Sequence, residues 1–192
     1  MEANSDVNWL VVGLGNPGPE YETMRHNLGF MLVDLLAGRS QTKIKRRECR
    51  SLIGRAEIAD QTVELVKPQT FMNLSGEAVS CLMAKENRLV DRLIVISDDL
   101  ALPFGSIRIR PRGTHGGHNG LRSLIDCLQT QEWTRLRIGI MPEHEVANSK
   151  DFVLESFARS DVETLDRVLD RAADAVRTII TDGVDAAMAR FN

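Results

Sequence analysis

Cysteine is scarce in this sequence. Its 192 residues include only three, Cys49, Cys81 and Cys127, which lie far apart, and no Cys-x-x-Cys motif occurs. An odd count without paired spacing predicts reduced thiols, as in cytosolic proteins. The missing Cys-x-x-Cys motif also argues against a structural zinc site.

Long apolar runs and flexible linkers are absent as well. No apolar run approaches the roughly 20 residues of a membrane helix, and no basic segment followed by an apolar stretch lies near the first residue. We therefore expect neither a membrane protein nor a secreted one. The 14 glycines and 6 prolines are too few for a fibrous or disordered chain. Because no segment rich in Gly, Ser and Pro divides the sequence, we expect one globular domain over residues 1–192. The cysteine pattern and the absence of a secretion signal predict a location in the cytoplasm.

The negative charge is small and unevenly distributed. The net charge is −3, but residues 143–192 carry −5 and residues 1–142 carry +2. Residues 39–50 hold six Lys and Arg against one Glu, and residues 104–137 hold six Arg against two acidic residues. A local basic face can bind phosphates on a protein that is acidic overall. For the first of these runs, a solvated charged surface is the alternative interpretation.

Strand-like runs alternate with helical patterns, which predicts an α/β protein. Apolar runs at 9–12 and 93–96 are typical of buried strands, and 52–59 with 62–67 predict a hairpin. Apolar residues at helical spacing predict helices over 22–37, 75–85 and 121–128. Ser160 with Glu163 forms a capping-box pattern before a long helix that Gly183 would end. Two further strands are expected at 106–110 and 136–140.

A glycine-rich loop follows the first predicted strand. Residues 13–18 fit the G-x-G-x-x-G pattern of a dinucleotide site. However, Pro17 and Pro19 flank the last glycine, and no second strand ends in an acidic residue about 20 positions later. A loop that exposes the side chain of Asn16 fits this segment better.

Three polar segments follow strand-like runs within a few residues. They carry Asn16, Asn73 and Asp98, and ligands of α/β sheets bind where strands end. We therefore expect these side chains at one edge of the sheet, with His26 brought there by the loop after Gly18. His26 has the chemistry of a general base, and a carboxylate at Asp98 would orient it and stabilise its charged form. The alternatives are a structural histidine, a turn after the strand, and helix capping by Asn73 or by the nearby serine at position 75.

A second glycine-rich loop, residues 113–120, opens the helix predicted from residue 121. Its backbone N–H groups suit an anion at a helix N-terminus. His115 and His118 have the H-x-x-H spacing of metal ligands, but no third ligand has a sensible spacing, so we expect no metal. No Gly-x-Ser-x-Gly motif and no cysteine in a polar context suggests covalent catalysis. One His, one Asp and several Asn instead suit direct activation of water against an activated bond such as an ester.

Five segments together resemble bacterial-type peptidyl-tRNA hydrolases: GLGNPGPEYETMRHNLGF (13–30), KPQTFMNLSGEAV (67–79), DDLALPFG (98–105), GTHGGHNGL (113–121) and RLRIGI (135–140). They occur in the order of the family and span nearly the whole chain. The resemblance implies hydrolysis of the ester between a peptide and the 3′ ribose of tRNA, which recycles tRNA from prematurely released chains. It also implies one α/β domain around a twisted, mixed sheet flanked by helices, a monomer, and no cofactor.

The resemblance also implies residue roles. His26 matches the general base of the family and Asp98 its partner. Asn16, Asn73 and Asn119 match substrate-binding asparagines, and Met72 lines the peptide site. The residues expected to contact tRNA are Tyr21, Arg108, Arg110 and Arg137.

Two other functions remain open. The family has plant-organelle relatives that act in RNA splicing through a protein partner without catalysis. The present chain carries all five residues that a hydrolase needs, and residues 1–8 contain no Arg, unlike an organelle transit segment. The second alternative is the dinucleotide-dependent enzyme that the first glycine-rich loop suggests.

Overall fold

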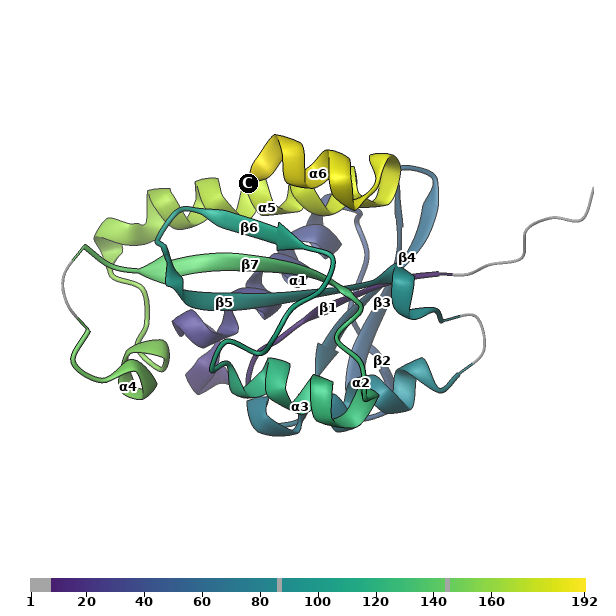
Figure 1. The fold of residues 1–192 in the computed structure, drawn as a ribbon, viewed down its shortest axis with the longest axis horizontal. Coiled ribbons are helices and arrows are strands. Elements are labelled where there is room, and N and C mark those ends of the chain that lie inside the picture. Colours follow the sequence, from purple (N-terminus) through teal and green to yellow (C-terminus); the bar gives the residue numbers. More distant parts are fainter. Residues whose placement is uncertain (1–7, 86–87, 144–145) are drawn as a thin grey trace, which may run out of the picture.

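A computed structural model describes residues 8–85, 88–143 and 146–192 (Figure 1). Its strands form one mixed seven-stranded sheet in the order β2-β3-β4-β1-β5-β7-β6. β1 is parallel to β4 and β5, β5 is parallel to β7, and the remaining neighbours are antiparallel. The strands are β1 Trp9–Gly13, β2 Arg46–Glu48, β3 Ser51–Ile58, β4 Gln61–Pro68, β5 Leu93–Pro103, β6 Ile107–Arg110 and β7 Thr134–Met141.

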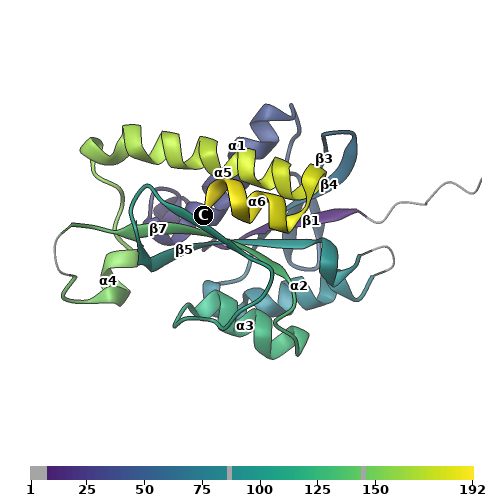
Figure 2. The same cartoon turned by 45° about the horizontal axis from the view of Figure 1, so that its top comes forward.

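Helices cover both faces of the sheet. Figure 2 shows α1, α5 and α6 on one side and α2 and α3 on the other. Successive side chains of a strand point to opposite faces, so Leu10 and Val12 pack in the core under α2 and α3, whereas Val11 packs under α1 and α5. The helices are α1 Leu28–Arg39, α2 Ser75–Met83, α3 Asn119–Leu128, α4 Ser149–Val153, α5 Val162–Asp182 and α6 Val184–Phe191. This confirms the predicted α/β class with a mixed sheet.

Two glycines bring α1 onto the centre of the sheet. A Cβ atom at Gly13 would lie 2.1 Å from the carbonyl oxygen of Gly29, and one at Gly29 would lie 2.3 Å from the backbone nitrogen of Leu14. Neither contact is possible for a larger residue. The start of α1 therefore lies directly against the end of β1, which places the residues just before α1 at the end of the strand.

The predicted hairpin and strands are confirmed, with one extension and one wrong helix start. β5 continues beyond the predicted 93–96 to Pro103, so Asp98 lies inside a strand and not in a turn after it. The helix predicted from residue 22 begins only at Leu28. Met24 instead has extended backbone angles and bridges Ser156, and the Arg25 N–H donates to the Glu155 carbonyl oxygen. This long-range pairing holds the segment out of the helix.

The predicted capping box is also wrong. The carboxylate of Asp161, not the side chain of Ser160, accepts the N–H of Ala158, and a short 3₁₀ turn, Arg159–Asp161, leads into α5. Gly183 ends α5 as expected, with φ 89°. None of the described helices is long and apolar enough to cross a membrane.

The expectation of reduced thiols is wrong for two of the cysteines. Cys49 and Cys81 form a disulfide, while Cys127 is free. Cys49 lies in the turn between β2 and β3, and Cys81 lies on α2. The two are 32 residues apart in the sequence, and only the packing of α2 beside this turn brings their Cα atoms to 5.6 Å.

Candidate active site

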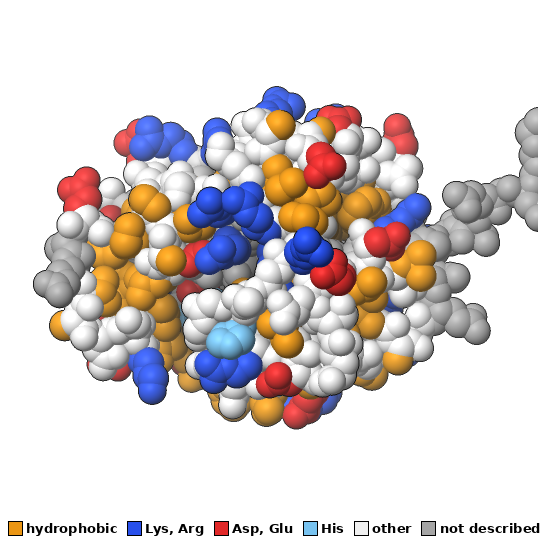
Figure 3. All heavy atoms as spheres, viewed as in Figure 1, with side chains coloured by type: hydrophobic (Ala, Val, Ile, Leu, Met, Phe, Trp, Pro, Cys, Tyr) orange, Lys and Arg blue, Asp and Glu red, His pale blue; other side chains and the backbone are white. Residues whose placement is uncertain are grey.

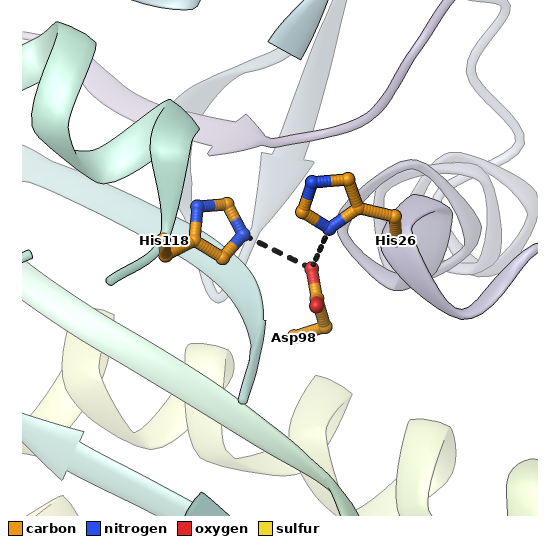
Figure 4. A group of neighbouring side chains, drawn as sticks. All are labelled: His26, Asp98 and His118. Atoms are coloured by element: carbon orange, nitrogen blue, oxygen red, sulfur yellow. Dashed lines mark hydrogen bonds and ion pairs between the residues drawn. The ribbon is translucent and has the colours of Figure 1, made fainter. Parts of the chain in front are cut away.

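Two histidines share one buried carboxylate at the edge of the sheet (Figure 4). His26 lies in the 3₁₀ turn Arg25–Asn27 before α1, Asp98 lies in β5, and His118 immediately precedes α3. The Oδ1 atom of Asp98 is 2.8 Å from Nδ1 of His26 and 3.0 Å from Nε2 of His118. The predicted contact between His26 and Asp98 is therefore present, and His118 is an additional member.

The hydrogen-bond partners assign the tautomers of both rings. Nδ1 of His118 accepts the backbone N–H groups of Gly120 and Leu121, so its proton lies on Nε2, which donates to Asp98. His26 donates Nδ1–H to the same oxygen. Its Nε2 atom is therefore an acceptor, which is the form that a general base requires.

Asp98 is held in its ionised form. Burial alone raises the pKa of this carboxyl, but the charges of His118 and His26 and their hydrogen bonds lower the pKa well below its usual value. A permanently negative oxygen between the rings orients both of them. It also stabilises positive charge that forms on His26.

The same three side chains have the composition of a metal site, and their ligand atoms lie within 4.8 Å of one another. However, Nδ1 of His118 already accepts two backbone N–H groups, so its Nε2 atom carries the proton and has no lone pair for a metal. In a metal-ligating histidine, the ring nitrogen that does not bind the metal normally donates its N–H to an acceptor, whereas here that nitrogen of His118 accepts. The hydrogen bonds thus fit a proton relay better than a metal centre. In the predicted H-x-x-H pair, Nδ1 of His115 accepts the N–H of Gly117.

Asn16 and Asn27 hold the first glycine-rich loop against the turn before α2. The Asn16 side-chain oxygen accepts the N–H of Met72 at 2.8 Å. The Asn27 side chain brackets the backbone of Asn16, accepting its N–H and donating to its carbonyl oxygen, both at 2.9 Å. Asn16 is buried and not exposed as predicted. Its Nδ2 group makes no hydrogen bond within the described ranges and is left for a ligand.

A cavity of about 290 Å³ opens beside the two histidines and Asp98. Asn119, the first residue of α3, lines it together with the glycine-rich loop and one side of α4. A Cβ atom at Gly120 would lie 2.5 Å from the sulfur of Met72, so a larger residue here would displace the Met72 side chain. Asn16 lines a neighbouring hollow with Asn27 and Lys67.

The β6–β7 ribbon next to this cavity carries arginines. Arg108 lies directly opposite Arg137, and Arg110 opposite Arg135, on neighbouring antiparallel strands. Figure 3 shows Lys and Arg side chains gathered over β6 and β7 on this face. Arg137 forms an ion pair with Asp99. Such a row of like charges is typical of a surface that binds phosphates.

Arg135 was not singled out from the sequence and is the buried member of this row. It is 2% exposed, donates to the carbonyl oxygen of Thr114, and lies 4.7 Å from the ring of Trp133. Burial and the charge of Arg137 lower the pKa of Arg135 to about 10. It thus ties the second glycine-rich loop to β7.

Two other predicted residues, Asn73 and Tyr21, do not line the cavity beside His26. Asn73 is exposed in the 3₁₀ turn Met72–Leu74. The alternative of capping by position 75 is wrong, because the Ser75 hydroxyl donates backwards to the Met72 carbonyl oxygen and caps no N–H. Tyr21 lies half-buried in the turn Pro19–Tyr21 and does not line the cavity beside His26.

His118 was missed as a partner of Asp98. Its signal was its place directly before a helix, after glycines, where a side-chain acceptor caps the first turn. The predicted helix start at residue 121 concealed that signal, since α3 begins two residues earlier.

Comparisons with known proteins show the family to which the chain belongs. Residues 10–192 match the family described as peptidyl-tRNA hydrolase. The chain is 46% identical to the peptidyl-tRNA hydrolase of Solibacter usitatus over 184 residues, which cover 96% of this chain and 94% of that one. It is 47% identical to the enzyme of Koribacter versatilis, covering 95% and 92%. The crystal structure of peptidyl-tRNA hydrolase from Acinetobacter baumannii superposes with a TM-score of 0.88 at 32% identity, covering 98% of this chain and 96% of that one.

Proposed function

Because the chain belongs to the peptidyl-tRNA hydrolase family, it acts as a hydrolase on the ester bond of peptidyl-tRNA, and we propose that a water molecule activated by His26 makes the attack. The observation that carries this mechanism is the fixed tautomer of His26. Asp98 accepts a hydrogen bond from Nδ1–H of His26. The Nε2 atom of His26 is therefore free to accept a proton. No covalent intermediate is needed.

In this reaction His26 accepts one proton from water and later returns it to the leaving group. Nε2 of His26 takes a proton from water as the water oxygen attacks the carbonyl carbon of the ester. Asp98 stabilises the imidazolium that results. When the tetrahedral intermediate collapses, His26 gives the proton to the departing 3′ oxygen of the ribose. The products are a peptide with a free carboxyl group and an uncharged tRNA.

Amide side chains supply the donors for the substrate. Asn119 lines the cavity beside His26, and the Nδ2 group of Asn16 is unused by the surrounding described residues. Asn73 is exposed in the turn beside Met72, and the side chain of Met72 is buried in the core beneath that turn. Donors of this kind stabilise a developing oxyanion, and loss of one costs about 10²–10³ in rate.

The arginine row supplies the tRNA contacts. Arg108, Arg110 and Arg137 lie on the strands beside the cavity, so phosphates near the 3′ end of tRNA can reach them while the ester lies at His26. Tyr21 adds an aromatic contact for the nucleic acid. We further propose that the protein acts as a monomer in the cytoplasm, without a cofactor.

The test uses purified protein with N-acetyl-aminoacyl-tRNA and, separately, with unblocked aminoacyl-tRNA, each with and without a chelator of transition metals. We expect rapid release of the blocked amino acid only, at the same rate with chelator. His26→Ala should lower turnover by orders of magnitude, and His115→Ala is the matched control because His115 does not contact Asp98. A folded protein that binds tRNA but releases nothing would favour the non-catalytic relative. Wild-type turnover in the His26 variant would refute the mechanism.

A further inference from the structure

A disulfide ties the β2–β3 turn to the helix that follows the substrate-facing turn at Met72. We propose that Cys49 and Cys81 form a reversible thiol-oxidation site, which takes a low-molecular-weight disulfide such as oxidised glutathione as its oxidant. Closing the bond restrains the turn that carries Met72 and Asn73. The thiol chemistry is independent of the proposed function. The effect of the bond on substrate binding at Asn73 and Met72 rests on the proposed function.

The pair is accessible to a small reagent. Cys81 is exposed on α2, and Cys49 is half-buried at the edge of the core formed with α2 and α3. A thiolate must reach a sulfur atom directly for exchange to occur. Because Cys81 is an exposed residue, a small reagent can approach it without unfolding of the protein.

Other contacts hold the two elements together when the bond is open. The backbone N–H of Gln69 donates to the carbonyl oxygen of Arg50 at 2.7 Å, next to Cys49. Arg50 also forms an ion pair with Glu77, one turn before Cys81 on α2. The two thiols therefore stay close in the reduced protein, and the second step of oxidation is intramolecular.

The turn pays a conformational cost to present these side chains. Cys49 and Arg50 have φ angles of 47° and 54°, and they are the two central residues of a hairpin between the paired Glu48 and Ser51. Turns of this kind favour Asn-Gly, because positive φ is unfavourable for other residues. Here both positions instead carry side chains that bind α2. Strained residues of this kind cluster where a turn has a task beyond reversing the chain.

The basic run at residues 39–50, which the hydrolase mechanism does not use, surrounds Cys49. Arg47 is exposed and makes no ion pair within the described ranges, two positions before the cysteine. An exposed positive charge attracts an anionic reagent. This charge favours glutathione disulfide, which is an anion, over a cationic disulfide.

The reaction balances as two thiol–disulfide exchanges. The Cys81 thiolate attacks one sulfur of glutathione disulfide, which forms a mixed disulfide and releases one glutathione thiolate. The Cys49 thiolate then attacks the Cys81 sulfur and releases the second glutathione. Two electrons pass to glutathione, and its two thiolates take up the two protons that the cysteines lost. Excess reduced glutathione reverses both steps.

The bond acts on substrate binding and not on the chemical step. Cys81 lies on the helix whose preceding turn carries Met72 and Asn73. His26 and Asp98 lie on other elements. Restraint of a binding turn lowers the entropy lost when substrate binds. We expect the oxidised protein to have a lower KM by about twofold to tenfold and the same kcat.

The first arm of the test is a titration of the full-length Cys127→Ser protein in buffers of defined glutathione ratio, read by alkylation and intact mass. Cys49 and Cys81 should lose alkylation together in one two-electron transition and regain it when reduced glutathione is added. In Cys49→Ser, Cys81 should instead carry a stable glutathione adduct. A bond that reduced glutathione never opens in the folded protein, or cysteines that never pair, would overturn the proposal.

The second arm compares both redox states in the esterase assay and in thermal unfolding. Oxidation should raise the melting temperature by roughly 7–14 °C, since it closes a loop from residue 49 to residue 81, and lower KM in the Cys127→Ser protein. Cys49→Ser should show neither effect. Equal KM in both states would refute the link to the Met72 turn. Inactivity in both states would refute the proposed function, and the titration would still decide the thiol site.

Discussion

The side-chain oxygen of Asn16 accepts the backbone N–H of Met72 across 56 residues of sequence. The first glycine-rich loop and the turn before α2 are therefore held as one unit, and the Nδ2 group of Asn16 makes no hydrogen bond to the described residues, so the proposed function can assign it to the substrate. One amide side chain thus has a structural end and a binding end. Two substitutions separate these roles.

Asn16→Ala removes both ends, whereas Asn16→Asp keeps an oxygen for Met72 and removes the amide donor. Under the proposed function, both variants should lose kcat/KM by about 10²-fold or more, because a donor to the substrate is lost. Only the alanine variant leaves the buried N–H of Met72 unsatisfied, at a cost of about 1–3 kcal/mol. Urea unfolding beside single-turnover kinetics measures the difference. Full activity in the aspartate variant would show that the amide group does not bind substrate.

The two roles of His118, capping α3 and binding Asp98, can be separated by substitution in the same way. His118→Asn keeps a side-chain acceptor for the N–H groups at the start of α3 but cannot reach Asp98. His118→Ala loses the cap as well and should be less stable than the asparagine variant by about 1 kcal/mol. Both should lower kcat by about tenfold or more, since Asp98 loses a charge-assisted hydrogen bond worth about 1.5–3 kcal/mol. If the asparagine variant keeps wild-type kcat, His118 serves the helix alone.

Asp98→Asn should change the pH–rate profile. The low pKa of Asp98 keeps it ionised throughout the neutral range, so its own titration contributes no limb near neutrality. The neutral amide no longer stabilises protonated His26, and the acidic limb of kcat should move to lower pH. Turnover should fall, although less than in His26→Ala. An unmoved limb would mean that Asp98 does not act through His26.

The arginine row predicts a salt effect. Arg108→Ala combined with Arg110→Ala should raise KM and flatten the dependence of log KM on log salt, by about 0.7–0.9 for each phosphate that the variant no longer binds. Arg112→Ala is the matched control, because Arg112 is exposed beyond the end of β6 and only loosely paired with Glu132. A fall in kcat with unchanged KM and salt slope would contradict phosphate binding.

A buried carboxylate on β4, paired with arginines, predicts an acid-dependent stability. Burial raises the pKa of Glu64, but Arg88 and Arg46 lower it below 4.5 overall. The stabilisation by this carboxylate is therefore complete above pH 4.5 and is lost as the pH falls below that value. Arg88→Met should cost up to about 3–5 kcal/mol at neutral pH, because it leaves the buried carboxylate with only the partly exposed Arg46 as its partner. This difference from wild type should shrink below pH 4.5.

The matched variant for this pair is Glu64→Gln combined with Arg88→Met. Without the buried charge, it should lose less stability than Arg88→Met alone at neutral pH, and position 64 should contribute no pH dependence to its own stability. Unfolding by urea at several pH values measures both variants. A single and a double variant of equal stability at pH 7 would exclude an electrostatic origin.

Patterns confined to one element predicted much of the fold. Two strand-like runs, 52–59 and 62–67, separated by two residues are sufficient to predict a hairpin. The partnership of His26 and Asp98 was predictable because both follow segments that end at the same edge of the sheet. Because side chains alternate between the two faces of a strand, Asp98 points to the same face of β5 as Ile96, which packs on the α1 side.

The features that were missed depend on distant segments. The start of α1 at Leu28 follows from the pairing of residues 24 and 25 with 155 and 156, which no local pattern records. The disulfide required the position of α2 relative to the β2–β3 turn. Propensity is a weak guide at such places, because tertiary contacts override it.

The bridge between Met24 and Ser156 sets an order of events during synthesis on the ribosome. The segment that carries His26 emerges early, yet its anchors, at residues 155 and 156, emerge about 130 residues later. Domains form as the chain lengthens from its N-terminus. A nascent chain that ends before this anchor therefore holds the base without the contacts that fix it. The turn that carries His26 therefore acquires its final geometry only after residues 155 and 156 have been synthesised.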